Sequence, residues 1–393
     1  MIQAVDAEGA FRGPNGYDRH LRGFVRGLHR RGIAVRVYDT GDRARPPVLQ
    51  SWQDPFFESL NRPVGARVLL QSRMPHHTPP RTDQAVANLT TFEATRVPPT
   101  WIDYGRRHAL TVVTSEVCRR AWIDSGAPAD RLRVCHLGFD PAAFSGSAEP
   151  MPLRLPNGQW VEEFRTRVLN ISALCPRKNL LGLMRAWLRA TSRDDDAILI
   201  QKLTIYHGSE YAWYLHQLDR IQDELGKRFD EAAPVRTIFR TFPDRDVPRL
   251  FAAATHYLSL SHGEGWDLPM LEAAASGLRL IAPDHSAYQT YLNPAIARML
   301  PSHEIPAVFP YTGPTAELFR GLNWWQPDED AAVEAIREAI AGHDAPTASA
   351  REHVLRHFTW DRATDRMVDI LTEAEEQAPP RRWWPSLRAY IGR

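Results

Sequence analysis

The sequence predicts an α/β protein with two Rossmann-like domains, each built on a doubly wound parallel sheet, that face each other across a cleft. Its length of 393 residues suits two or three domains of ordinary size. Short apolar runs alternate with amphipathic stretches, a pattern typical of parallel strands covered by helices. The alternation stops at residues 144–158, which are rich in Ser, Pro and Gly, and then starts again.

The first half of the chain opens with an apolar run, a glycine-proline loop at residues 13–16 and a stretch with helical spacing that stops at Gly32. We expect strands at 1–5, 33–38, 68–71, 87–91, 110–114 and 132–136, and helices at 17–31 and 116–125. Residues 1–150 are therefore expected to form the N-terminal domain.

The second half repeats the pattern after the break. We expect strands at 167–172, 197–203, 235–239, 256–261 and 278–282, and helices at 179–191, 211–227, 328–341 and 360–375. Residues 151–360 are expected to form the C-terminal domain. Ligands of such sheets bind at the carboxyl ends of the strands.

The composition excludes several classes of protein. No apolar run reaches the length of about 18 residues that a membrane span needs, and the first residues lack the pattern of a signal peptide, so we expect a cytoplasmic protein. Cys118, Cys135 and Cys175 lie far apart, which argues against a disulfide framework or a thiolate zinc site. A net charge of +1 argues against a dedicated nucleic-acid binder.

The most informative segment is an apolar strand followed by the loop 262–267 and a helix. Asp267 is expected to cap this helix, Pro269 suits its first turn, and Gly277 is expected to end it. A strand, a glycine loop and a helix start in this order direct unpaired backbone N–H groups toward the cleft, where they can bind an anion.

Two carboxylates belong to the same segment, Glu264 in the loop and Glu272 on the helix. They cannot share one helix face, but they can hold one ligand from two sides. A carboxylate accepts two hydrogen bonds at once, which suits the vicinal hydroxyl groups of a sugar.

Glu264 and Glu272, separated by seven residues in GEGWDLPMLEAAASG, resemble the paired-glutamate (E-x7-E) motif of retaining glycosyltransferases with the GT-B fold. The similarity is to the large fourth glycosyltransferase family. Further segments are similar to it in the same order and extend over most of the chain. They are the loop 13–16 with Tyr17, the strand–helix–strand segment 112–144, ISALCPRKNLLGLMRAWLRAT and FTWDRATDRMVDIL.

The resemblance implies transfer of a hexose or pentose from a nucleoside-diphosphate sugar to a hydroxyl group by same-face substitution, with retention of the anomeric configuration. A UDP- or GDP-sugar is the favoured donor, and no metal or other cofactor is expected. The N-terminal domain would bind the acceptor and the C-terminal domain the donor. Residues 361–393 would form a helix and tail that pack back onto the N-terminal domain.

Residue roles follow from the same resemblance. Glu272 would bind the ribose and Glu264 the transferred sugar, while Lys178 would offset the charge of the leaving diphosphate. The segment after Glu264 would hold the sugar and phosphates through Gly265, Trp266, Asp267 and Leu268.

The chain departs from the family pattern where Gly-Arg is replaced by Ser172-Ala173, so the usual arginine partner of the lysine is absent. Arg177 could replace it. So could Lys202, which follows an apolar run at the carboxyl end of a strand.

On the N-terminal side, Gly16 is expected to let the backbone approach the phosphates. Tyr17 and Glu93 are expected on the acceptor side, although a structural role for Glu93 fits the sequence equally well.

The acceptor remains open among a glycan, a small molecule, a lipid and a modified base of DNA. Arginine-rich stretches in the first half favour DNA, whereas the near-neutral net charge opposes it. The missing arginine at Ala173 leaves a third hypothesis, a catalytically weak protein that binds a nucleotide sugar. The tail 378–393 has four arginines and no acids, so it either packs against the domains or contacts the inner membrane face peripherally.

Overall fold

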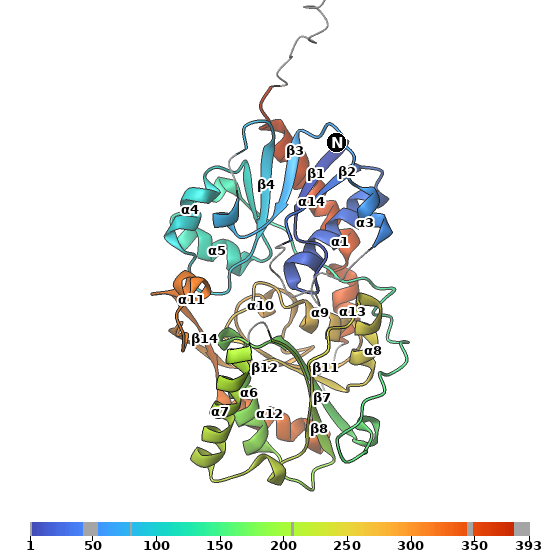
Figure 1. The fold of residues 1–393 in the computed structure, drawn as a ribbon, viewed down its shortest axis with the longest axis vertical. Coiled ribbons are helices and arrows are strands. Elements are labelled where there is room, and N and C mark those ends of the chain that lie inside the picture. Colours follow the sequence, from blue (N-terminus) through green and yellow to red (C-terminus); the bar gives the residue numbers. More distant parts are fainter. Residues whose placement is uncertain (1, 42–53, 79–80, 206–207, 344–348, 381–393) are drawn as a thin grey trace, which may run out of the picture.

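The computed structural model describes residues 2–41, 54–78, 81–205, 208–343 and 349–380. It contains two parallel six-stranded sheets with helices packed around them, one above the other in Figure 1. The predicted pair of doubly wound α/β domains is therefore confirmed. The predicted boundaries after residues 150 and 360 stay predictions.

The first sheet has the strand order β2-β1-β3-β4-β5-β6. Its two central strands, VLLQS and AVANLT, are buried along their whole length, as expected for strands with helices on both faces. The strands are β1 (Ala4–Gly9), β2 (Ala34–Asp39), β3 (Val68–Ser72), β4 (Ala85–Thr90), β5 (Leu110–Val113) and β6 (Leu132–Val134). The helices around it include α1 (Gly16–Arg30), α3 (Pro55–Ser59), α4 (Pro99–Gly105) and α5 (Glu116–Asp124).

The first strand is displaced from its predicted position at residues 1–5. It runs from Ala4 to Gly9 because its two acidic side chains find buried partners. Gln84 donates to Asp6 (2.7 Å), and Gln71 donates to Glu8 (2.8 Å). A pattern of apolar residues cannot reveal such pairs, so the prediction ended the strand at the first charge.

The second sheet has the order β12-β11-β10-β7-β8-β9. Its strands are β7 (Thr166–Ala173), β8 (Ala197–Thr204), β9 (Val235–Ile238), β10 (His256–Leu258), β11 (Arg279–Pro283) and β12 (Arg298–Leu300). The main helices are α6 (Leu180–Ala190), α7 (Gly208–Leu225), α8 (Val247–Ala252), α9 (Leu268–Ala275), α10 (Tyr288–Tyr291), α12 (Glu329–Ala341) and α13 (Ala350–His357).

The strand predicted at residues 256–261 ends at Leu258. The N–H of Ser259 still donates to the carbonyl of Ile281 in β11 (3.1 Å), but the N–H of Ser261 donates to the Ser259 hydroxyl (3.3 Å), a local bond outside the sheet. Residues 259–267 therefore form one long loop between β10 and α9.

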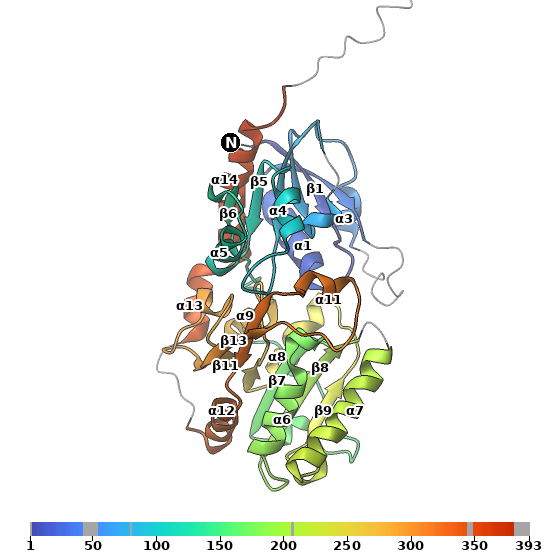
Figure 2. The same ribbon diagram turned by 90° about the vertical axis from the view of Figure 1, so that its left-hand side faces the viewer.

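A segment without predicted elements, residues 302–327, forms an antiparallel hairpin and a short helix. These are β13 (Ser302–Pro306), α11 (Pro314–Phe319) and β14 (Asn323–Pro327). We call residues 302–327 the arm. Figures 1 and 2 both place α11 at the level where the two domains meet.

The helix α14 (Trp360–Glu376) follows the second domain in sequence but packs against α1, β3 and β4 of the first. Two glycines of α1 allow this approach. A Cβ atom on Gly23 would lie 2.5 Å from the Trp360 ring, and one on Gly27 would lie 2.0 Å from the Thr364 hydroxyl oxygen. Most of the predicted tail, residues 381–393, lies outside the described residues.

None of the helices in the described ranges combines the length and apolar character that a membrane crossing requires.

Candidate active site

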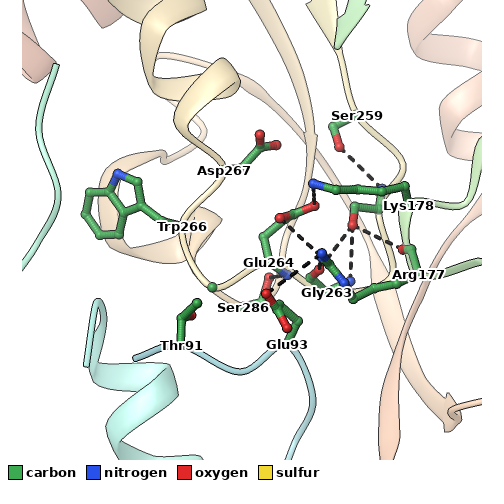
Figure 3. Close-up of polar contacts among 12 residues, drawn as sticks. Thr91, Glu93, Arg177, Lys178, Ser259, Gly263, Glu264, Trp266, Asp267 and Ser286 are labelled. Carbon is green, nitrogen blue, oxygen red and sulfur yellow. Dashed lines mark hydrogen bonds and ion pairs between the residues drawn. The ribbon is translucent and has the colours of Figure 1, made fainter. Parts of the chain in front are cut away.

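The loop 259–267 places Glu264 at the carboxyl end of the second sheet, beside two cations (Figure 3). The Nζ atom of Lys178 lies 2.5 Å from Glu264 Oε1, and the Nη1 atom of Arg177 lies 3.2 Å from Oε2. Both cations belong to the 3₁₀ turn Pro176–Lys178 after β7. Asn179, in the left-handed conformation (φ 49°), ends this turn and caps α6.

The charges of this cluster are set by burial and pairing. Burial raises the pKa of Glu264, but Lys178 and Arg177 outweigh it and lower the pKa to about 2. Burial lowers the pKa of Lys178, but the charge of Glu264 leaves it above its ordinary value. Glu264 is therefore ionised and Lys178 protonated over the physiological range.

Arg177 also joins the two domains. Its Nη2 atom lies 3.8 Å from Oε1 of Glu93 in the segment after β4, and burial raises the pKa of that carboxyl. Its guanidinium donates to the carbonyl of Gly263, and its own carbonyl accepts from the N–H of His262 (2.8 Å). Arg177 thus fixes the start of the Glu264 loop as well as its charge.

Lys202 lies elsewhere, on β8. Its ammonium donates to the Thr204 hydroxyl (2.7 Å), and burial lowers its pKa to about 8. Of the two residues expected to replace the missing arginine, the structure therefore places Arg177, and not Lys202, next to Lys178 and Glu264.

The segment after Glu264 lies directly against the first domain. The Thr114 hydroxyl donates to the carbonyl of Gly265. Trp266 stacks on His136, with ring centroids 5.3 Å apart, and Tyr291 donates to the Trp266 carbonyl (2.8 Å). The backbone of this segment is thus held from both domains.

Asp267 occupies the N-cap position of α9, as expected, although its side chain makes no capping hydrogen bond of ordinary geometry. Its backbone is left-handed (φ 62°, ψ 73°), a conformation that few residues other than glycine adopt. The Tyr288 hydroxyl donates to Oδ2 instead (2.7 Å), and burial together with the charge of Glu264 raises the pKa of Asp267 to about 6. Leu268 begins α9 and is buried.

Glu272 lies on α9 with only 2% of its surface exposed and pairs with Arg19 of α1 across the domain interface. Burial raises the pKa of Glu272 to about 7 although Arg19 opposes the shift. Its second oxygen, Oε2, is buried without a hydrogen-bond partner in the described part of the chain. An adjoining cavity of about 250 Å³ is lined by Arg19, Glu272 and residues of both domains.

The sequence analysis did not identify Arg19. It lies one turn into the helix that follows the glycine loop, and this position could have indicated it, because that end of α1 faces the second domain.

On the opposite wall, α1 begins at Gly16 and is capped by the Asn15 side chain. Gly16 is exposed, and a Cβ atom there would have its nearest neighbour 3.6 Å away, so a methyl group would fit at the start of α1. The Tyr17 hydroxyl lies 3.2 Å from the Thr90 hydroxyl and accepts from the N–H of Thr91 (3.2 Å). Tyr17 therefore holds the end of β4 in place.

Comparison with known proteins adds a fold assignment. No family model matches the sequence. Over 139 residues the chain is 32% identical to ORF330, a candidate glycosyltransferase of Acidianus filamentous virus 2. The match covers 34% of this chain, which spans 37% of the length of that relative.

Solved structures match nearly the whole chain. HepE from Anabaena, in complex with UDP and glucose, has a TM-score of 0.60 at 13% identity, and the match covers 94% of this chain and 99% of that one. Sucrose-phosphate synthase from Thermosynechococcus elongatus has a TM-score of 0.65 at 14% identity, over 95% of this chain and 100% of that one. The chain has the GT-B fold. The fold class predicted from the sequence is confirmed.

Within this GT-B fold the predicted site residues fall into separate groups. Glu264, Lys178, Arg177 and Glu93 form one cluster, and Gly265 to Leu268 continue from it into α9. Glu272 pairs with Arg19 instead, and Lys202 donates to Thr204. Within the described ranges no group of three or more His, Cys, Asp or Glu residues could hold a metal ion.

Proposed function

We propose that this protein is a retaining glycosyltransferase that moves a hexose or pentose from a nucleoside-diphosphate sugar to a hydroxyl group of an acceptor. The observation that carries the proposal is Glu264, buried and ionised between Lys178 and Arg177 where the second sheet meets the first domain. Such a cluster supplies both a sugar-binding carboxylate and fixed positive charge. The complexes of HepE with UDP and with UDP-glucose support a nucleotide-sugar donor.

The bond changes of the proposed reaction are balanced without a protein base. The acceptor oxygen forms a bond to the anomeric carbon on the face from which the diphosphate leaves. The bond between that carbon and the phosphate oxygen breaks, and the hydroxyl proton passes to this oxygen. Lys178 and Arg177 stabilise the negative charge that develops on the diphosphate.

Lys178 can serve the diphosphate while it remains paired with Glu264. An ammonium group has three donors, and Glu264 uses one of them. The carboxylate fixes the direction of the ammonium group, so little reorganisation is needed when the donor binds.

Glu272 is proposed to bind the ribose, because its unpartnered Oε2 can accept a hydroxyl group. The backbone from Gly265 to Leu268 is proposed to hold the sugar and phosphates, with the open start of α1 at Gly16 opposite. Glu93 and Tyr17 are proposed on the acceptor side. The absence of a metal requirement and the identity of the acceptor stay predictions.

A thermal-shift screen across UDP-, GDP-, ADP- and TDP-sugars tests the donor. A donor at a hundred times its Kd stabilises the protein by about 2.7 kcal/mol, so one or two donors should raise Tm clearly. Glu272→Ala should abolish this shift, and Lys227→Ala, on the far side of the second domain, should leave it unchanged.

The donor that raises Tm is then incubated with the enzyme, and free nucleoside diphosphate is measured. Slow hydrolysis or transfer supports an active enzyme over a binding protein, and the anomeric coupling constant of the product reports retention. No Tm shift and no diphosphate release with any donor would contradict the proposal.

A further inference from the structure

The arm (302–327) belongs to the second domain by sequence and to the first by packing. Its Phe319 and Trp324 share one apolar cluster with residues of the first domain, among them Phe92, Trp101 and Trp122. The rings of Phe92 and Phe319 stack with centroids 4.6 Å apart. The carbonyl of Asn323 accepts from the N–H of Thr95 (2.9 Å), so a backbone bond accompanies the apolar contact.

The arm also contacts the start of the Glu264 loop. Trp325 and His262 exchange two hydrogen-bond contacts. The Trp325 N–H donates to the His262 carbonyl, and His262 Nδ1 contacts the Trp325 carbonyl, both at 2.9 Å. The His262 ring also stacks on Trp324 at 4.9 Å, with the planes 13° apart. His262 is two residues from Glu264, so this contact constrains the loop on its N-terminal side.

A second path leads from Trp325 to the same glutamate. Its indole stacks on the ring of His285 at 5.1 Å, with the planes 9° apart. His285 Nδ1 contacts the hydroxyl of Ser286 (3.0 Å), which accepts a hydrogen bond from the N–H of Glu264 (3.2 Å). Trp325 therefore reaches Glu264 through its backbone on one path and through its side chain on the other.

The clearance around the loop is small. A Cβ atom on Gly263 would lie 2.4 Å from the carbonyl oxygen of Glu93, so the loop lies directly against the first domain. A carboxylate that acts on a substrate must be held within a fraction of an ångström of its working position. The arm contacts both the first domain and the loop that carries Glu264, so it can fix the position of Glu264 relative to the first domain.

We propose that the arm is a positioning element for Glu264 and that Trp325 is its main positioning residue, acting through His262 and through His285 with Ser286. This inference rests on the proposed function, because it assigns Trp325 a role in the reaction at the Glu264 site. In this proposal Trp325 acts on Glu264 through the contacts with His262 and His285.

The first test is independent of activity. Hydrogen exchange is measured for peptides that cover residues 262–267 in the wild type, Trp325→Ala, Trp325→Phe and Val308→Ala. Trp325→Ala removes the stack on His285 and should speed exchange of this loop about tenfold while β7 and β8 exchange as in the wild type. Trp325→Phe keeps a ring there and should restore protection. Val308 is a solvent-exposed residue of the same arm, so its variant is the matched control.

Unchanged exchange in Trp325→Ala would overturn the proposal whether or not the protein is a glycosyltransferase. An equal increase in Trp325→Ala and Val308→Ala would overturn the role of Trp325, because the effect would then not depend on its stack on His285.

The second test links the position to turnover. Trp325→Ala should lower kcat about tenfold to a hundredfold with little change in the donor KM, and Trp325→Phe should recover most of the activity. In a Glu264→Gln background, the further loss caused by Trp325→Ala should be much smaller. If the loss of kcat in the double variant equals the product of the losses in the two single variants, the positioning role of Trp325 is overturned. Absence of turnover in the wild type would count against the proposed function alone.

Discussion

The hydroxyl oxygen of Thr91 lies 1.6 Å from the point that a Cβ atom on Gly265 would occupy. Gly265 belongs to the second domain and Thr91 follows β4 of the first, so the domains meet here without room for one methyl group. The close approach of the Thr91 side chain is therefore sufficient to explain a glycine at position 265, without any role in substrate binding.

Gly265→Ala should therefore lower the free energy of unfolding by about 1–3 kcal/mol, the usual range for overpacking. Adding Thr91→Ala removes the nearest atom and should recover part of the loss. Urea unfolding of the single and double variants measures both effects. Gly16→Ala is the control, since its nearest neighbour would be 3.6 Å away. Equal stability of Gly265→Ala and the wild type would show that the domains separate readily at this point.

Lys178→Ala should lower kcat about a hundredfold to a thousandfold, the usual effect of removing one electrostatic contact to a developing anion. Lys178→Arg should also lower turnover, because a planar guanidinium cannot take the place of an ammonium group 2.5 Å from Glu264 beside Arg177. Steady-state kinetics with saturating donor measure both variants, with Lys227→Arg as the matched control. Wild-type kcat in Lys178→Arg would mean that charge alone matters there.

Arg19→Ala should destabilise the protein more at pH 8 than at pH 5. Burial already raises the pKa of Glu272 to about 7 against the opposition of Arg19, so losing Arg19 raises it further. At low pH Glu272 is protonated in both the folded and the unfolded protein, so its raised pKa costs no stability. As the pH rises above the ordinary pKa of a glutamate, the unfolded protein loses this proton first, and the cost to the folded protein grows until the pH passes the raised pKa. If the loss of Arg19 raises the pKa of Glu272 by one more pH unit, the added cost is about 1 kcal/mol at pH 8 and close to zero at pH 5.

Unfolding free energies at the two pH values measure this difference. The double variant Arg19→Ala/Glu272→Gln should lose the pH dependence, since its glutamine cannot ionise. A single-variant loss that is the same at pH 5 and pH 8 would contradict the assignment to Glu272.

Glu264 predicts the opposite pH dependence. Its pKa is about 2 in the folded protein against an ordinary value of 4.5, so its stabilising contribution is complete above 4.5 and disappears as the pH falls toward 2. Between pH 5 and pH 3 the wild type should lose about 2 kcal/mol more than Glu264→Gln does. Thermal unfolding across this range measures the difference. Parallel curves for the two proteins would show that Glu264 is not held by its cations.

Much of the fold could be predicted because local patterns determine it. Buried strands such as VLLQS and AILIQ are recognisable from their own residues, and Gly277 ends α9 with a positive φ of 82°, as expected. Elements that depend on distant partners were harder to predict. The arm has prolines at 306, 310, 314 and 327 and few β-branched residues, and its Phe319 and Trp324 are buried against the first domain.

The candidate site divides in the same way. Glu264 and Glu272 are visible in the sequence because they belong to one short motif. The pair of Arg19 with Glu272 joins residues 253 positions apart, and Arg177 meets Glu264 across two different loops of the second domain. No local pattern encodes either relationship.

The helix α14 has implications for how this chain folds as it is made. The first domain consists of strands between residues 4 and 134 together with a helix at 360–376 that covers the glycine face of α1. At a synthesis rate of about 5–20 residues per second, on the order of ten seconds or more separates the emergence of these two parts from a ribosome. During that interval α1 exposes the apolar surface that Trp360 later covers. The first domain is therefore completed only after the second has been synthesised.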